Sequence, residues 1–211
     1  MKKPDPKDRR TQKLEAILGV AKAMATQHDL GILLEHIVEH ARRVVGADRG
    51  SIFLLDKDKH ELWSKVAHGT TEIRFPADKG IAGHVTQTKT PLNIPAAYAD
   101  PRFNPAVDQV TGYHTRNMLT VPMLSTKEDV VGVLQVLNKY PTHSSFDAED
   151  EEMLLALGGQ AAAAIESAIL YDEINKLFEG FISASVVAIE SRDPTTSGHS
   201  GRVATLTCGL A

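Results

Sequence analysis

The sequence has 211 residues, of which 42% are apolar, and a formal net charge of −4. This length allows one domain with extensions or two small domains, and the apolar content is sufficient for a packed core. The mild negative charge excludes a general attraction to nucleic acid or to anionic membranes, so an anionic ligand would need a local site.

The N-terminal residues and the single cysteine indicate the compartment. Residues 1–10 are charged and contain prolines, which predicts disorder rather than a signal peptide. No apolar run approaches the ~20 residues of a membrane span. Cys208 is the single cysteine, so we expect no intrachain disulfide and a reducing, cytoplasmic location. Residues 200–211 resemble an interrupted helix, and we therefore expect the chain to be the N-terminal part of a longer protein.

Two helices are predicted before the first strand. Apolar residues at helical spacing between 11 and 27 predict the first helix. Asp29 is placed to cap a second helix, whose apolar stripe includes Leu33 and Ile37. Gly46 is expected to end this second helix because glycine readily adopts the left-handed conformation of a C-cap.

A hairpin and a short helix are predicted next. The runs 51–56 and 62–67 are strand-like and are separated by a charged turn. The sequence Gly80-Ile81-Ala82-Gly83 is expected to open a short helix that continues to about residue 88. Residues 91–94 predict a brief strand.

The remaining chain predicts a loop, two strands and a long helix. Residues 95–116 predict a long ordered loop with helical turns, and a loop of this length in a compact domain is usually functional. Strong strand patterns follow at 118–124 and 130–138, and a helix is expected from Asp147 to about Ile189. The fold class is therefore α+β: an antiparallel sheet with flanking helices, with a ligand cavity possible on one face.

Polar groups in the loop and at the short helix are the candidate binding groups. The helix N-terminus at Ile81 and Ala82 offers N–H groups to a phosphate, although a glycine turn alone is often only a helix start. Four loop residues offer groups that suit a purine or a ribose, although ordinary turn chemistry is the favoured explanation when these residues are considered alone. These four residues are Asn104, Asp108, Thr111 and Thr115.

Two further patterns favour structural explanations. His36 and His40 have a spacing that can hold a metal, but they lie among charged residues on the expected solvent face of a helix. The acidic run from Asp147 to Glu152 is explained by the dipole of the helix that begins there. No nucleophile–base pair with a defensible geometry is present, so no catalytic residue is predicted.

The segments around these residues resemble a known family. DKGIAGHV, the run from Pro91 to Met123, and VVGVLQVLNK are similar to the cyclic-nucleotide-binding GAF domains of phosphodiesterases and adenylyl cyclases. The signature of that family is N-K, a variable gap, F, three residues and D-E. This signature is complete here, and the resemblance covers about 14–171. The signature residues are Asn138, Lys139, Phe146, Asp150 and Glu151.

The resemblance implies a GAF/PAS-like fold, a structural ion pair between Lys139 and Asp150, and a set of ligand contacts. The amides of Ile81 and Ala82 would face the cyclic phosphate. Relatives often have acidic residues where His68 and Gln135 stand, so the resemblance does not choose between cAMP and cGMP. The implied contact positions are Ser51, His68, Ile81, Ala82, Asn104, Asp108, Thr111, Thr115 and Gln135.

A second resemblance concerns the end of the chain. Residues 185–206 are similar to the opening of HD-GYP phosphohydrolase domains, which hydrolyse cyclic di-GMP at a metal centre. His199 matches the first metal-ligand position of that family, so divalent iron or manganese is expected only in the complete output domain. The resemblance implies no cofactor and no hydrolase activity for this chain itself.

The predicted organisation follows from both resemblances. We expect a disordered segment at 1–10, a GAF sensory domain at 11–171, a connecting helix at 172–190 and the start of an HD-GYP domain at 191–211. The expected assembly is a parallel homodimer through helices 11–27 and 147–190, because the apolar residues of the long helix continue past Tyr171. The partners predicted are a cyclic mononucleotide and a second copy of the chain, without nucleic acid or membrane.

Three alternatives to a cyclic-nucleotide sensor are considered: an enzyme of the same fold, a cofactor sensor that binds bilin or haem, and a GAF module without a ligand. A free-methionine-sulfoxide reductase or a bilin sensor needs a cysteine at the pocket, and Cys208 lies far outside it. A haem sensor needs an axial ligand, for which His68 and His114 are available. The third alternative is a GAF module that binds no small molecule and serves only for dimerisation and signal transmission.

Overall fold

The structure, a computed structural model, describes residues 29–64 and 73–190. The predicted helix at 11–27, the disordered segment at 1–10 and the HD-GYP-like segment at 191–211 lie outside the described residues. The chain divides into two compact units, Met1–Ala168 and Ile169–Ala211, which are considered separately.

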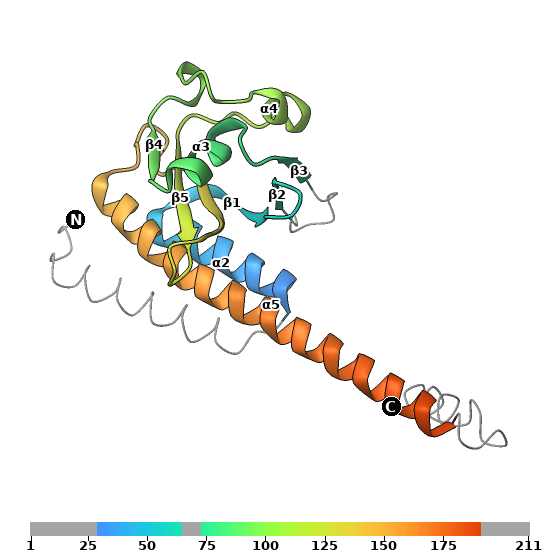
Figure 1. The fold of residues 1–211 in the computed structure, drawn as a ribbon. Coiled ribbons are helices and arrows are strands. Elements are labelled where there is room, and N and C mark those ends of the chain that lie inside the picture. The colour runs from blue at the N-terminus through green and yellow to red at the C-terminus, as the bar shows by residue number, and fades with distance from the viewer. Residues whose placement is uncertain (1–28, 65–72, 191–211) are drawn as a thin grey trace, which may run out of the picture. The chain divides into compact units, whose positions relative to one another are not determined.

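The first unit is built on a six-stranded antiparallel sheet (Figure 1). Its strand order is β3-β2-β1-β6-β5-β4, so the two longest strands, β1 and β6, are adjacent at the centre. The strands are β1 (Ala47–Asp56), β2 (Glu61–Ser64), β3 (Ile73–Pro76), β4 (Leu92–Ile94), β5 (Met118–Leu124) and β6 (Val130–Lys139). This architecture confirms the predicted α+β class.

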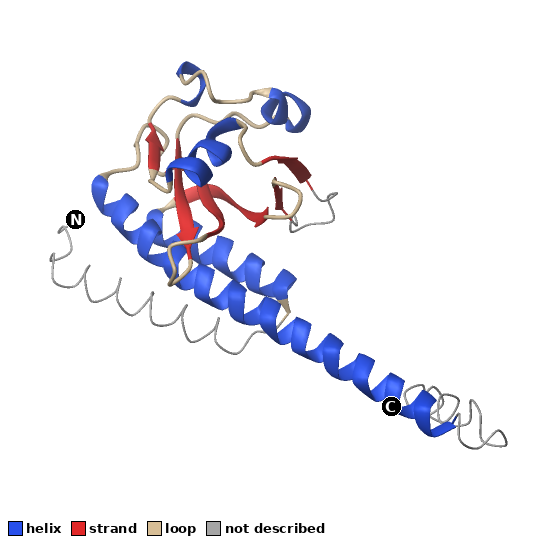
Figure 2. Cartoon of the chain, viewed as in Figure 1, coloured by secondary structure: helices blue, strands red, loops and turns tan. Residues whose placement is uncertain are grey.

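One face of the sheet is covered by α2 (Leu30–Val45) and by the N-terminal part of α5 (Ala148–Glu190), which lie side by side in Figure 2. Alternate residues of the central strands point to this face, because successive side chains of a strand face opposite sides. Ile52, Leu134 and Val121 form one buried core with Leu33 and Leu154 of the two helices.

The ends of α2 follow from its sequence. The side chain of Asp29 accepts a hydrogen bond from the backbone N–H of Ile32 at 3.0 Å, as an N-cap should. Gly46 ends the helix in the left-handed conformation with φ 63°. Both caps confirm the sequence prediction.

The opposite face of the sheet carries α3 (Gly80–Thr88). Val85 and Ala82 of α3 are buried against Val133 of β6. The loop between β4 and β5 contains a 3₁₀ turn, η1 (Ala97–Ala99), and one short helix, α4 (Ala106–Thr111). The loop was therefore correctly predicted to be ordered with helical turns.

The sequence prediction missed β3. Its strand, Ile73–Pro76, pairs with β2, but its sequence, IRFP, is short and ends in proline. The run predicted as strand 62–67 is described only to Ser64, where β2 ends.

The second unit is described from Ile169 to Glu190, where it is helical throughout. Large apolar side chains on this segment are exposed: Leu177 is 75% exposed and Phe181 is 70% exposed. This is an unusual concentration of exposed apolar surface, since isolated exposed apolar residues are common but clusters mark interaction sites.

Helix α5 is also long and apolar enough, by length and composition, to cross a membrane. Its most apolar window within Ala148–Ala188 has a mean hydropathy of 1.6, and 44% of that window is buried inside the protein. This stretch was not expected from the sequence, where polar residues such as Gln160 and Glu166 interrupt the apolar runs. Burial of the window agrees with its role as the core helix of this fold.

Candidate functional site

A polar row crosses the three central strands on the face that carries α3. Ser51 of β1 pairs with Gln135 of β6, which in turn pairs with Thr120 of β5. The Gln135 side-chain amide donates a hydrogen bond to Thr120 Oγ1 at 2.9 Å. Two of these residues were predicted from the resemblance, whereas Thr120 was missed, although a lone polar residue within the apolar strand 118–124 was a usable signal.

Apolar residues border the polar row on both sides. The pairing places Leu137 and Met118 on one side and Val133 and Pro122 on the other. Ile81 of α3 packs in the cluster that contains Met118. Ala82 of the same helix belongs to the cluster that contains Val133. The first turn of α3 therefore contacts both apolar borders of the polar row.

The start of α3 has the features of an anion-binding helix terminus. Gly80 has φ 69°, a left-handed conformation that other residues adopt only with strain. The N-cap, Lys79, makes no side-chain cap hydrogen bond. Since the first N–H groups of a helix have no intrahelical carbonyl partner, the amides of Ile81 and Ala82 are suited to an anionic ligand.

Asp108 and Thr115 form a buried polar contact between α4 and the segment that leads into β5. Asp108 Oδ1 accepts from Thr115 Oγ1 at 2.9 Å, and Asp108 Oδ2 accepts from the Thr115 amide at 2.7 Å. Tyr98, which the sequence analysis did not select, donates its hydroxyl to Asp108 Oδ2 at 3.0 Å. Desolvation and this carboxylate raise the pKa of Tyr98.

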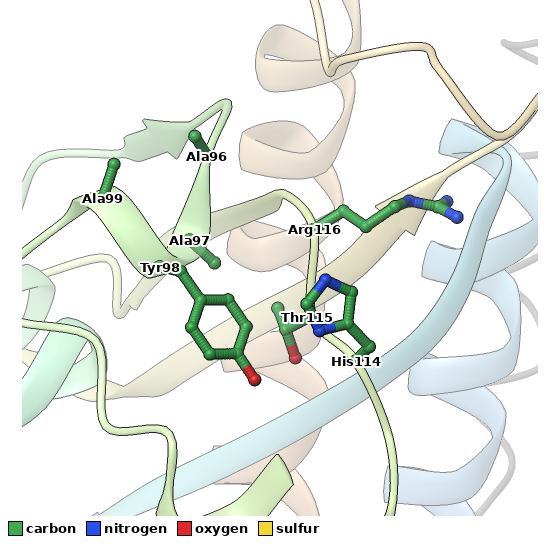
Figure 3. Close-up of a pocket in the computed structure, with 7 residues that line it drawn as sticks. All are labelled: Ala96, Ala97, Tyr98, Ala99, His114, Thr115 and Arg116. Atoms are coloured by element: carbon green, nitrogen blue, oxygen red, sulfur yellow. The ribbon is translucent and has the colours of Figure 1, made fainter.

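An open hollow of about 460 Å³ lies beside this contact, between η1 and the segment before β5 (Figure 3). The rings of Tyr98 and His114 stack with centroids 4.9 Å apart. Thr115 is the predicted ligand residue that lines this hollow, and Arg116 also lines it. Tyr98 and His114 present aromatic rings to this depression, whereas the Arg116 guanidinium points away from η1 and donates to the Lys139 carbonyl at 3.4 Å (Figure 3).

The structure places only one of the remaining predicted site residues with its side chain. Asn104 is exposed, and its side-chain oxygen accepts from the Ala106 amide at 3.0 Å, which is ordinary turn chemistry. The side chain of Thr111 is not described, although its backbone ends α4. His68 and His199 lie outside the described residues.

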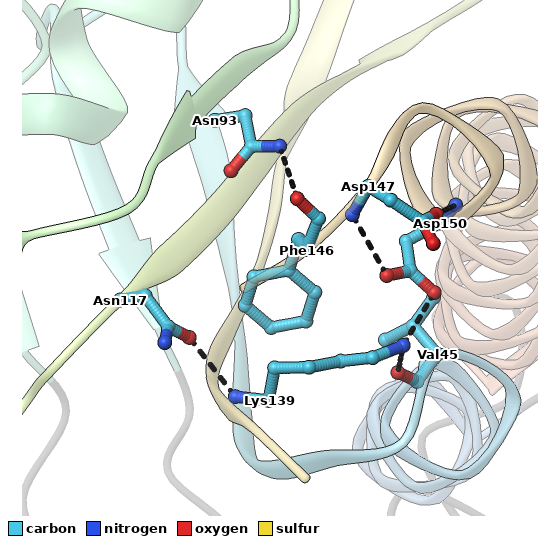
Figure 4. A network of polar contacts seen from close by, with 7 residues as sticks. All are labelled: Val45, Asn93, Asn117, Lys139, Phe146, Asp147 and Asp150. Atoms are coloured by element: carbon cyan, nitrogen blue, oxygen red, sulfur yellow. Dashed lines mark hydrogen bonds and ion pairs between the residues drawn. The ribbon is translucent and has the colours of Figure 1, made fainter. Parts of the chain in front are cut away.

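The signature residues form a network where the sheet meets α2 and α5 (Figure 4). The expected ion pair is present, with Lys139 Nζ 2.6 Å from Asp150 Oδ1. The same ammonium group donates to the carbonyl of Val45, the last residue of α2, at 2.6 Å. Phe146 is buried, and its ring centroid lies 5.8 Å from Lys139 Nζ. Glu151 is half-buried in the first turn of α5.

Asp147 and Asp150 cap α5 reciprocally. The amide of Asp150 donates to Asp147 Oδ1 at 2.9 Å, and the amide of Asp147 donates to Asp150 Oδ2 at 3.0 Å. This is the capping-box arrangement. Two amide side chains hold the preceding segment: Asn93 of β4 donates to the Phe146 carbonyl, and Asn117, just before β5, donates to the Ser144 carbonyl. The acidic run therefore has the structural role that its position indicated.

A tyrosine–aspartate cluster lies at the β1 end of this network. Asp48 accepts hydrogen bonds from the Tyr140 hydroxyl at 2.6 Å and from the Tyr113 hydroxyl at 2.8 Å. These two bonds lower the pKa of Asp48. The Arg49 guanidinium lies 3.8 Å from the centre of the Tyr113 ring. None of these residues was selected from the sequence, because they are far apart along the chain.

Within the described residues, no group of three or more histidine, cysteine, aspartate or glutamate side chains could hold a metal ion. His36 is exposed on α2 and His40 is partly exposed, as expected for a solvated helix face. Desolvation and the nearby positive charge of Arg43 lower the pKa of His40.

Comparison with known proteins assigns this architecture to a family. The family model described as "GAF domain" matches residues 29–165. The chain belongs to the GAF family. It thus contains a domain of a sensory and regulatory type, whose sheet and helices are those described above.

One relative of this chain is a nematode protein named as a phosphodiesterase. The chain is 34% identical over 170 residues to "Probable 3',5'-cyclic phosphodiesterase pde-5" of Caenorhabditis elegans. The matched region covers 74% of the chain and 23% of that relative, so the chain spans about a quarter of the length of this relative.

Solved structures of other proteins share the fold. The GAF domain of an Acinetobacter phosphoenolpyruvate-protein phosphotransferase aligns with a TM-score of 0.64 and 22% identity, covering 77% of this chain and 98% of that one. The free methionine-R-sulfoxide reductase of Neisseria meningitidis aligns with a TM-score of 0.63 and 17% identity, covering 81% and 96% of the two chains. At these identities, the likeness concerns the fold alone.

Proposed function

We propose that this GAF domain binds a cyclic mononucleotide, cAMP or cGMP, on the sheet face that carries α3. The observation that carries the proposal is the complete N-K…F…D-E signature, from Asn138 to Glu151, in a domain of the GAF family. The relative named as a 3',5'-cyclic phosphodiesterase supports the same ligand class. The domain would act as a regulatory input for an output domain elsewhere in the protein.

The phosphate would lie at the first turn of α3. The backbone amides of Ile81 and Ala82 carry the partial positive charge of a helix N-terminus, and Lys79 provides no competing side-chain cap. The position is water-poor, because both residues are buried. A singly charged cyclic phosphate matches such a site without requiring a further cation.

The base and ribose would contact the polar row and the loop. Ser51 and Gln135 offer a hydroxyl and an amide from the sheet, and Asp108 and Thr115 offer a carboxylate and a hydroxyl from the loop side. By resemblance, His68, Asn104 and Thr111 would complete the contacts. Gln135 and His68 replace residues that are often acidic in relatives, so the proposal includes both purines.

Titration calorimetry with cAMP and cGMP tests the proposal. We expect one ligand per chain for at least one nucleotide. The Ser51→Ala variant should bind about fivefold more weakly, because one hydrogen bond to the ligand is worth about 1 kcal/mol. Its free energy of unfolding should stay within about 0.5 kcal/mol of the wild-type value, since Ser51 is only half-buried.

Ser144→Ala is the matched control. Ser144 is also half-buried, but it lies in the segment before α5, away from the polar row. It should bind the nucleotide as the wild type does. A flat calorimetric trace with both nucleotides at millimolar concentration would show that the proposed ligand class is wrong.

The alternative function is dimerisation and signal transmission without a small-molecule ligand. The observation that favours it is the exposed apolar surface of the second unit, where Leu170, Ile174, Leu177 and Phe181 are each more than half exposed. We propose a parallel homodimer through this segment in either case. A dimeric chain that binds neither nucleotide would support the alternative.

We also propose that the output of the longer protein is an HD-GYP phosphodiesterase for cyclic di-GMP. The support is the resemblance of residues 185–206, in which His199 takes the first metal-ligand position. One histidine does not make a catalytic metal site, so this chain alone should be inactive. The longer protein should hydrolyse cyclic di-GMP with iron or manganese, whereas this chain should not; turnover by this chain would contradict the assignment.

A further inference from the structure

Asn138 contacts the loop side of the fold through four hydrogen bonds. Its side-chain oxygen accepts from the amide of Arg116 at 2.7 Å and from that of Asn117 at 3.4 Å. Its side-chain nitrogen donates to the His114 carbonyl and to the Tyr113 hydroxyl, both at 2.8 Å. The side chain is 4% exposed, so these bonds are shielded from water. One residue therefore fixes the whole segment that leads from the loop into β5.

The next residue contacts the helix side. Lys139 Nζ bonds to the Val45 carbonyl at the end of α2 and to Asp150 in the first turn of α5. The backbone amide of Lys139 donates to Asn117 Oδ1 at 2.9 Å. Adjacent residues of one strand end thus contact the loop segment and the ends of both helices.

The backbone at this point is constrained. Asn138 has φ 57°, in the left-handed region where asparagine is tolerated better than most residues. This conformation interrupts the extended geometry of β6 just before its last residue, Lys139, which still pairs with Ala47 of β1. Because the four side-chain bonds and the backbone conformation belong to the same residue, a shift of the segment 113–117 displaces the position of Lys139 directly.

The loop side of this path begins at the proposed ligand residues. Asp108 of α4 holds both the amide and the hydroxyl of Thr115, and Arg116 follows Thr115 in the chain. A continuous series of direct contacts therefore runs from α4 through Thr115 and Asn138 to Lys139 and Asp150. All of these residues lie within the first unit.

We propose that Asn138 is the positioning residue that transmits the state of the Asp108–Thr115 contact to the first turn of α5. This inference rests on the proposed ligand site, because it names how that site is connected to the helix. A ligand that engages Asp108 or Thr115 changes their mutual bonds and moves the segment 113–117. Asn138 passes this movement to Lys139, and the Asp147–Asp150 capping box responds. Asn138 itself need not touch the ligand.

Amide hydrogen exchange at Asp147 and Asp150, resolved by NMR on the 211-residue chain, tests the transmission. The first perturbation is ligand-free: Thr115→Val deletes the hydroxyl that donates to Asp108. In the otherwise wild-type chain, this substitution should change the exchange rates of the two capping-box amides by about fivefold or more, the range of ordinary coupling energies. In the Asn138→Gly background, the same substitution should leave them unchanged, because glycine keeps the backbone conformation but removes the four bonds.

The second perturbation is saturation with the nucleotide that binds. Saturation should change the exchange rates of the Asp147 and Asp150 amides in the wild type but not in the Asn138→Gly variant. The amides of residues 105–117 should become protected from exchange in both proteins, because both bind the nucleotide. Asn138→Asp is a second variant that keeps the acceptor oxygen and loses the two donated bonds, so its response should be intermediate. It also keeps the test decisive if the glycine variant is too unstable.

Asn93→Ala is the matched control. Asn93 also holds the segment before α5, but it does so from β4, by donating to the Phe146 carbonyl at 3.0 Å rather than to residues 113–117. The response of α5 should survive in this variant. Equal responses of the capping box in Asn138→Gly and in the wild type would overturn the proposal, as would no response to Thr115→Val in the wild type. A failure of nucleotide binding alone would refute the proposed ligand and leave the Thr115→Val comparison to decide the transmission.

Discussion

Lys139 and Asp150 show how much one ion pair holds together in this fold. Both side chains are mostly buried, with exposed fractions of 18% and 10%. Asp150 also accepts the Asp147 amide, and Lys139 also bonds to Val45. Because the two charges are shielded from water, each depends on the other for compensation.

We expect Asp150→Ala to lower the free energy of unfolding by about 3–5 kcal/mol, because it leaves the Lys139 ammonium group mostly buried without its carboxylate. Chemical denaturation monitored by circular dichroism measures this change. The control is Glu152→Ala, which removes an exposed carboxylate from the same end of α5 and should change stability by less than about 0.5 kcal/mol. Equal stability of the Asp150→Ala variant and the wild type would show that the pair is not a structural link.

Individual residues also mark the limit of sequence reasoning at the site. The Lys139–Asp150 pair could be anticipated because both residues belong to a recognisable signature. Two other contacts could not be anticipated: Tyr98 bonds to Asp108, and Tyr113 bonds to Asn138. Tyrosines in a loop give no periodic signal in the sequence. Asn104 was predicted as a ligand residue, yet its observed bond is a local turn contact, which the sequence pattern alone fits equally well.

At the scale of elements, strong local signals were translated correctly into structure. Asp29 and Gly46 bound α2, and the glycines at 80–83 place the start of α3. Gly83 is needed there because a Cβ would lie 2.6 Å from the carbonyl carbon of Asp78. This requirement arises from packing between α3 and the segment before it, so the sequence shows the glycine but not the reason for it.

Elements with weak local signals were missed or only approximately placed. The strand β3 has four residues, most of them exposed, and is specified by pairing with β2 rather than by an apolar pattern. The same holds for the polar row, whose three residues are brought together by the register of β1, β6 and β5. Register is a property of the assembled sheet, so it becomes visible only when the strands are paired.

At the scale of the whole molecule, the two units differ in how their apolar residues are used. The first unit buries most of its large apolar side chains in clusters on the two faces of the sheet. The second unit, as far as it is described, presents its large apolar side chains to solvent. Exposed residues repeat along it with alternating spacings of four and three, which is the heptad pattern of a coiled coil. These residues are Leu170, Ile174, Leu177, Phe181, Ala184 and Ala188.

Further apolar residues widen this stripe. Tyr171, Phe178, Ile182 and Val187 are among the exposed residues next to the heptad positions. A stripe of this width is typical of a helix in a bundle rather than of the narrow seam of a two-stranded coiled coil. The helix predicted at 11–27, which was expected to join the same interface, lies outside the described residues.

The homodimer can be tested through two positions of the stripe. Burying the apolar area of this segment against a second copy is favourable by roughly 25 cal/mol per Å². We therefore expect the chain, whose mass is 22.9 kDa, to have twice that mass by light scattering at a concentration of ~100 μM. The double variant Leu177→Glu/Phe181→Glu should be monomeric, because two charges in the stripe would have to be desolvated. Its first unit should unfold at the wild-type temperature, since neither residue belongs to the core.

Glu179→Ala is the control for this experiment. Glu179 is exposed on the same segment but lies opposite the heptad positions, so its loss should leave the dimer intact. A monomeric wild type at this concentration would contradict the proposed assembly, and a double variant that stays dimeric would place the interface elsewhere. If the wild type and the control are dimeric and the double variant is not, the exposed stripe is the surface that joins the two copies, because only substitutions within the stripe separate them.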